Sequence, residues 1–280
     1  METKVNKATV NVSKKPVAKK NGGFKGIRAA WVVMLICFVL AVCVYKFILG
    51  SPENFQGGDP ANNSVNMLGT IYKGGFVVPI IWTLFFTVVS LTIERILALR
   101  TAFGHTSLVK FVKDTRAALD KNDLDGVQKI CDKQGGSVAN VVSATLLKYK
   151  EVETNDSLTK DQKVICIQKA LDEATALEMP SLQENLPILA VITTLGVLFG
   201  LFGTVLGMIR SFSALSAGGG ADSAALSQGI SEALVNTASG IATSALAVIF
   251  YNYFTNKIDK LTYSLDEVGF TIVQNFSATH

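Results

Sequence analysis

The sequence predicts an all-α integral membrane protein with four transmembrane helices. Of its 280 residues, 49% are hydrophobic and 17% are charged, whereas soluble domains carry about 25% charged residues. Four stretches contain no Asp, Glu, Lys, Arg or His: 29–45, 74–93, 185–209 and 233–256. A bilayer core about 30 Å thick needs roughly 20 apolar helical residues, so we expect one span in each stretch. The first extends to residue 49 if Lys46 snorkels to the membrane surface.

These spans are predicted to be helices because a segment in hydrocarbon must pair all of its own backbone polar groups. A transmembrane barrel would instead show strands of alternating polarity. The observed apolar runs are continuous. They therefore favour a bundle of helices over a barrel.

Basic residues lie unevenly around the four spans. Of 26 Lys and Arg, eight precede the first span, thirteen lie between the second and third, and two follow the last. Only Lys46, Lys73 and Arg210 remain for the opposite side. Because basic loops stay in the cytoplasm, both termini and the region 95–184 are predicted to be cytoplasmic. The loops at 50–73 and 211–231 are predicted to face outward.

The segment between the second and third spans is predicted to be helical. Residues 107–124 and those that follow have apolar side chains at helical spacing, interrupted at Gly135–Gly136. A longer helix begins after Thr159, a residue type that favours helix N-termini. It continues into the third span, and we expect Pro180 and Pro187 to kink it rather than to end it.

The last span also continues beyond the membrane as an amphipathic helix. Its apolar residues there are Ile258, Leu261, Leu265 and Val268. The third and fourth spans are therefore predicted to be long helices whose cytoplasmic ends form a helical bundle with the insert.

A glycine stripe runs along the third span. At 3.6 residues per turn, Gly196, Gly200, Gly203 and Gly207 fall within about 60° of one another. Small residues let membrane helices approach closely. We therefore predict a helix-packing face here, with Gly240 on the corresponding face of the fourth span.

Polar side chains gather on the fourth span. Thr237 and Ser244 share a face with Gly240, and Glu232 and Asn236 lie on the adjoining face. Single hydroxyls in membrane helices often bond to the preceding turn of their own helix, but a whole row indicates a face turned away from lipid. In an antiparallel hairpin, Thr204 of the third span lies at the depth of Thr237, and Glu232 lies nearer the outer mouth.

No Asp, Glu, His, Lys or Arg lies at the midplane of any predicted span. A proton relay needs a titratable group within the membrane, so if this chain conducts protons, another subunit must supply the acid. We find no spacing typical of a metal site, no nucleophile–base set and no phosphate-binding loop. The prediction is therefore a non-enzyme without metal or cofactor. The net charge of +4 follows from topology and does not indicate nucleic-acid binding.

Two motifs resemble the ExbB/TolQ/MotA family of ion-driven motor subunits, and ExbB most closely. They are "GLFGTVLGMIRSF" at 200–212 and "GISEALVNTASGIATSALAVIFYN" at 229–252. Two upstream pieces also fit, "SLTIERILAL" at the end of the second span and "LDEATALEMPSLQENLPILAVIT" before the third. The resemblance extends over roughly residues 76–260.

The resemblance implies a ring of identical subunits, a pentamer in the family, in a bacterial inner membrane. Inside the ring lie single-span ExbD-like partners, each with a membrane aspartate, and a TonB-like transducer carries the energy of the proton motive force to the outer membrane. Protons are then the transported ion. The residues predicted to line their pathway are Thr204, Thr237, Glu232, Asn236 and Ser244.

With the resemblance, the chain divides into four parts: a basic cytoplasmic tail (1–28), an additional transmembrane helix (29–49), a periplasmic linker (50–75) and an ExbB-like motor-subunit domain (76–280). That domain comprises spans at 76–95, 186–212 and 230–256, a cytoplasmic insert at 96–185 and a C-terminal helix at 257–280. The additional span departs from the three-span ExbB pattern. A TolQ-like envelope motor, a MotA-like gliding or flagellar stator, and a passive membrane scaffold remain as alternatives.

Overall fold

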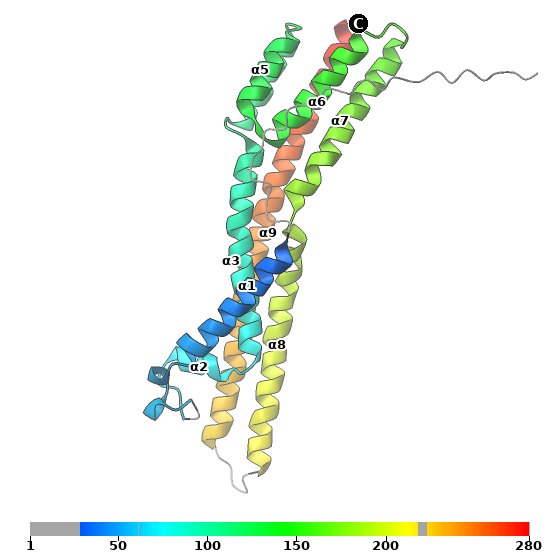
Figure 1. Cartoon of the computed structure of the whole chain (residues 1–280). Helices are drawn as coiled ribbons and strands as arrows, with labels where there is room; N and C mark the ends of the chain where they lie inside the picture. Colours follow the sequence, from blue (N-terminus) through cyan, green and yellow to red (C-terminus); the bar gives the residue numbers. More distant parts are fainter. Residues whose placement is uncertain (1–28, 61, 218–222, 280) are drawn as a thin grey trace, which may run out of the picture.

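The computed structural model describes residues 29–60, 62–217 and 223–279. The predicted tail at 1–28 and the tip of the turn between the last two spans lie outside these described residues. Figure 1 shows an elongated molecule in which the end of α8 (Leu186–Ala217) and the start of α9 (Ser223–Thr279) lie at one end. The C-terminus lies at the other end, beside α5 (Leu124–Gln134), α6 (Gly136–Glu153) and α7 (Lys160–Gln183). The described part of the chain is built of helices, as predicted.

Four helical stretches in the described part are long and apolar enough to cross a membrane: Ala30–Leu49, Val77–Leu119, Lys160–Ser213 and Leu226–Thr279. The prediction of four spans is confirmed at this level. The additional span is α1 (Ala30–Cys43), continued by a π-helical turn over Val44–Leu49. It crosses α3 (Val77–Phe103) obliquely, and the Cys37 sulfur lies 3.5 Å from the Ser90 hydroxyl.

The segment at 50–75 is more structured than the predicted linker. It contains 3-10 turns at Pro52–Asn54 and Gln56–Gly58, and the short helix α2 (Met67–Lys73). The Asn54 side chain donates hydrogen bonds to the Ile48 and Leu49 carbonyls, at 2.7 and 2.9 Å. Asparagine-rich turns of this kind satisfy backbone groups locally, so the composition that suggested a linker instead produces a folded segment.

The insert folds as four helices: α4 (Leu108–Leu119), α5 (Leu124–Gln134), α6 (Gly136–Glu153) and α7 (Lys160–Gln183). The predicted break between α5 and α6 is confirmed, because Gly135 and Gly136 have positive φ values of 62° and 76°, which glycine adopts without strain. The predicted cap is also confirmed. Thr159 and Gln162 form a reciprocal capping box at the start of α7.

These helices pack with the C-terminal part of α9 (Ser223–Thr279) and the end of α3 around one apolar core. We call this part the bundle half. The apolar half consists of α1, α8 (Leu186–Ala217) and the parts of α3 and α9 beside them. Figure 1 shows α9 running through both halves.

The prediction that α7 continues into the third span with a kink is wrong. Helix α7 ends at Gln183 and α8 begins at Leu186. Asn185, between them, has a positive φ of 65°, a conformation that asparagine tolerates better than most residues. Pro187 lies in the first turn of α8, where its missing N–H does no harm, and Pro180 stays inside α7.

Candidate functional site

Helices α8 and α9 meet through glycines rather than large side chains. A Cβ added to Gly240 would lie 2.8 Å from the Gly200 Cα atom and would also overlap the Gly196 carbonyl oxygen. A Cβ on Gly200 would lie 3.2 Å from the Thr237 Cα atom. The two backbones are therefore in direct contact at this level.

The other two glycines of the stripe also face α9. A Cβ on Gly203 would lie 2.5 Å from the Asn236 Cβ atom, and one on Gly207 would lie 2.7 Å from the Ala233 Cβ atom. Each glycine thus receives a side chain of the neighbouring helix. All five predicted packing glycines lie in this α8–α9 contact.

The structure brings Thr204 and Thr237 together. Their hydroxyl oxygens are 3.2 Å apart, as the hairpin register predicts. Thr204 donates to the Leu201 carbonyl at 2.7 Å, and Thr237 donates to the Gly200 carbonyl at 3.0 Å. Each hydroxyl has one proton and two lone pairs. With both protons turned to the backbone, this hydroxyl pair is free to accept a hydrogen bond from a further donor.

The hydroxyl pair is half-buried, so it is open on one side of the single chain. Thr204 also forms part of a shallow groove along α8, together with Val205, Met208 and Ile209. Apart from the hydroxyl and two serines at its far end, apolar side chains line this groove.

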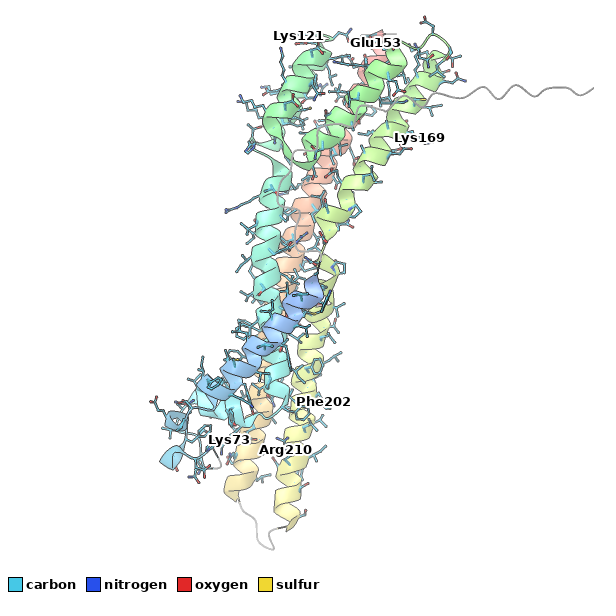
Figure 2. The ribbon with its side chains drawn as sticks, viewed as in Figure 1. Lys73, Lys121, Glu153, Lys169, Phe202 and Arg210 are labelled. Atoms are coloured by element: carbon cyan, nitrogen blue, oxygen red, sulfur yellow. The ribbon has the colours of Figure 1, made fainter. Side chains whose placement is uncertain are left out.

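Glu232 lies on α9, nearer than Thr237 to the N-terminus of that helix. It is five residues from Thr237, about 7.5 Å along the helix axis, and it accepts a hydrogen bond from the Gln228 side chain at 3.1 Å. Figure 2 shows Lys73, Phe202 and Arg210 toward the same end of the molecule, opposite Lys121 and Lys169.

Asn236 and Ser244 are enclosed within the chain. Asn236 is 3% exposed and donates to the Gly74 carbonyl at 3.0 Å, at the junction of α2 and α3. Ser244 is also buried and donates to the Thr193 carbonyl of α8. Both side chains hold helices of one subunit together, unlike the half-exposed hydroxyl pair.

A buried polar cluster, in which Arg95, Glu94 and Asn185 meet, was not predicted from the sequence. Arg95 was interpreted as a charge that sets topology, yet its side chain is fully buried. Its guanidinium donates two hydrogen bonds to Glu94, at 2.6 and 2.5 Å, and Asn185 donates to the same carboxylate at 3.3 Å. In the sequence, this cluster is indicated only by the adjacent acid and base, Glu94 and Arg95, directly after the charge-free stretch 74–93.

Comparison with known proteins gives the same family as the motifs. Residues 139–267 match the MotA/TolQ/ExbB proton channel family. This stretch contains the α8–α9 contact and the hydroxyl pair. It also contains Asn185 but not Glu94 and Arg95.

Individual relatives carry ExbB and TolQ names. An ExbB-like biopolymer transport protein of Synechocystis sp. is 40% identical over 87 residues, which is 30% of this chain and 41% of that protein. The Tol-Pal system protein TolQ of Pseudomonas aeruginosa is 31% identical over 124 residues, 44% of this chain and 54% of that protein. The biopolymer transport protein ExbB of Helicobacter pylori is 39% identical over 94 residues, 34% of this chain and 64% of that protein.

The matched stretches cover between 41% and 64% of the length of these three relatives. Together with four apolar helices, these matches identify a multi-pass membrane protein. Over the stretch 139–267, slightly less than half of its length, the chain is similar to the MotA/TolQ/ExbB proton channel family.

Proposed function

We propose that this chain is the ring-forming subunit of an ExbB-like motor driven by the proton motive force. With an ExbD-like single-span partner, it conducts protons across the bacterial inner membrane and energises TonB-dependent transport. The observation that carries the proposal is the half-exposed hydroxyl pair, Thr204 and Thr237, with its oxygens 3.2 Å apart. Thr204 and Thr237 belong to two stretches, 185–209 and 233–256, that contain no Asp, Glu, His, Lys or Arg.

The hydroxyl pair suits a carboxyl group supplied by a partner. A protonated carboxyl group donates to a hydroxyl oxygen, and a carboxylate accepts from a hydroxyl proton. Thr204 and Thr237 offer both interactions because their protons can turn from the backbone carbonyls to the partner. Threonine does not itself titrate near neutrality, so the partner's aspartate carries the proton and the hydroxyl pair stabilises it in either form.

Several subunits and several protons would act together in each working cycle. One proton crossing the membrane releases about 2.3 kcal/mol per 100 mV. This small step favours a homo-oligomeric ring, which we propose to be a pentamer around the partner helices. We further propose that both termini and the bundle half lie in the cytoplasm, since the basic residues other than Lys46, Lys73 and Arg210 are concentrated there.

The experiment is to purify the complex with the proteins that accompany it and to measure proton flux after reconstitution into liposomes. We expect a single-span protein with a membrane aspartate to co-purify. In that complex, Thr204→Val and Thr237→Val each lower flux roughly tenfold or more, because a hydrogen bond to a charged group contributes about 1.5–3 kcal/mol. Assembly of the complex is expected to be retained.

Thr83→Val is the matched control. Thr83 lies on α3, and its hydroxyl donates only within its own helix, to the Pro79 carbonyl at 2.6 Å. Flux should stay close to that of the unmodified complex. Unchanged flux in both Thr204 and Thr237 variants would favour the passive scaffold, and so would flux from this chain reconstituted without a partner.

A TolQ-like role is the second candidate, favoured by the match to the TolQ protein of P. aeruginosa over 124 residues. A MotA-like stator belongs to the same class. All three predict loss of flux in the threonine variants. The outer domain of the co-purified partner, and the transducer bound to it, distinguish them.

A further inference from the structure

The junction between α7 and α8 is where the bundle half meets the apolar half. Only Glu184 and Asn185 separate the two helices, and the backbone turns there through the positive φ of Asn185, 65°. The last carbonyls of a helix have no partner within that helix. Leu182, Asn185 and Leu186 are buried at this junction, although Gln183 between them is exposed.

Arg95 reaches the end of α7 from α3. Its Nη1 atom lies 3.4 Å from the Ser181 carbonyl oxygen and 3.4 Å from that of Leu182. A cation at a helix C-terminus is favourable because the exposed carbonyls give that end a partial negative charge. Arg95 thus serves as a C-terminal cap that comes from a different helix.

Glu94 holds the other side of the junction. Its carboxylate is 4% exposed, balances the charge of the fully buried Arg95, and accepts a hydrogen bond from Asn185 at 3.3 Å. Two consecutive residues of α3 therefore bind the residues that end α7 and precede α8. The sequence match to the family, over residues 139–267, does not include them.

We propose that Glu94, Arg95 and Asn185 form a joint that fixes the angle between α7 and α8, so that α8 and the bundle half move as one body. Removing one member of a buried ion pair leaves an uncompensated charge, which is strongly unfavourable. The joint therefore resists partial opening in a way that a purely apolar contact does not. Arg95 acts as a positioning residue, and the joint does not depend on which ion or transducer the protein serves.

A distance measurement across the junction tests the joint in the assembled protein. Spin labels are attached through Leu177→Cys on α7 and Val191→Cys on α8, which are 77% and 55% exposed, in a chain whose native cysteines are replaced by alanine. Labelled chain is diluted with unlabelled chain so that only distances within one subunit contribute. With the joint intact, we expect one narrow distribution of distances.

Arg95→Gln removes the charge that caps α7, and we expect the distribution to shift or to broaden at least twofold. Arg95→Lys, which keeps the charge, is expected to restore part of the narrow distribution. The matched control is Lys169→Met, which removes an exposed ion pair within α7, where the Lys169 nitrogen is 3.9 Å from Glu173. It should leave the distribution unchanged.

The paired change Glu94→Leu with Arg95→Met covers the case in which Arg95→Gln does not fold. It leaves no buried charge, and it is expected to give a folded subunit with a broadened distribution. A narrow, unshifted distribution in this variant, or in a folded Arg95→Gln protein, would overturn the proposal. The measurement needs no proton flux, so its outcome is separate from that of the threonine variants.

Discussion

Helix α9 makes two different kinds of contact along its length. In the apolar half it presents Ala233, Gly240 and Ala247 to its neighbours. In the bundle half it presents large buried side chains at spacings of three or four residues. They are Phe254, Ile258, Leu261, Leu265, Val268, Ile272 and Phe276.

The surroundings of each half explain the change. In lipid, large apolar side chains gain little by leaving the solvent, so helices associate through close backbone packing and hydrogen bonds. In water, burial of apolar surface contributes about 25 cal/mol per Å², which favours large side chains in a core. The residues on the buried face of α9 are therefore small in the part that lies in lipid and large in the part that lies in water.

The difference in packing between the two halves also determines where polar side chains meet. In the apolar half, the glycines let the backbones of α8 and α9 touch, so there is no room for large side chains between them. This close packing places the hydroxyl oxygens of Thr204 and Thr237 3.2 Å apart. The bundle half supplies rigidity instead. The Glu94–Arg95 pair lies at the boundary between the two halves, where Arg95 contacts the end of α7.

Truncation of a large side chain should affect the bundle half most. Phe276 is fully buried, and its ring packs edge-on against Tyr149 with centroids 4.9 Å apart. We expect Phe276→Ala to lower the free energy of unfolding by about 3–5 kcal/mol, from lost burial and the cavity left behind. Chemical denaturation of the purified protein, followed by the loss of helix signal, measures this.

Phe270→Ala is the control for that experiment. Phe270 lies on the same helix, but its side chain is 69% exposed, so the change should stay within about 0.5 kcal/mol. Equal losses at the two positions would contradict the assignment of α9 to a core through Phe276 and its neighbours.

Addition of a single methyl group should affect the apolar half more than the bundle half. Gly240→Ala places a Cβ against the backbone of Gly196 and Gly200, which cannot move aside, so we expect a loss of about 1–3 kcal/mol. Gly269→Ala in the bundle half places its Cβ against the Leu171 side-chain tip. That tip can rotate, and alanine favours the helix by up to about 1 kcal/mol, so the net change should be near zero.

Thermal unfolding of both glycine variants in the same detergent tests this difference. Gly240→Ala is also expected to lower proton flux, because it separates the two threonine hydroxyls. If Gly269→Ala were the more damaging substitution, then the proposed contrast between backbone contact and side-chain contact would be wrong.

Much of this architecture follows from local patterns in the sequence. Charge-free runs define the four spans, and the capping preference of Thr159 and the flexibility of Gly135–Gly136 define helix ends in the insert. The depth of Thr204 relative to Thr237 follows from hairpin register alone. Each of these features depends on residues close together in the chain or on a simple helical period.

Other features depend on partners that are distant in sequence. Asn236 was assigned to an open polar face, but its buried partner is the Gly74 carbonyl, 162 residues away. Arg95 was counted among the basic residues that set the topology, but it caps a helix that ends 88 residues later, at Gln183. The break after α7 was predicted as a kink because proline positions alone do not reveal that a neighbouring helix can satisfy a helix end.

The surface of the bundle half should contribute least to stability. The Lys150 nitrogen lies 2.5 Å from the Asp125 carboxylate and links α6 to α5. This hydrogen bond, together with the lysine charge, lowers the pKa of Asp125 below its ordinary value of 3.8. A depressed pKa in the folded state means that the stabilisation is complete above the ordinary value and is lost as the pH falls through the folded value.

Asp125→Asn is therefore expected to cause a small loss of stability at neutral pH. The difference from the unmodified protein should vanish once the pH falls below the pKa of the folded state, and it should also shrink at high salt, because Asp125 is 84% exposed and exposed pairs are screened. Unfolding midpoints measured at several pH values and two salt concentrations check both dependences. A stability difference that persisted in acid would mean that Asp125 acts through packing. Surface residues of the bundle half would then contribute to its stability as well as the buried face of α9.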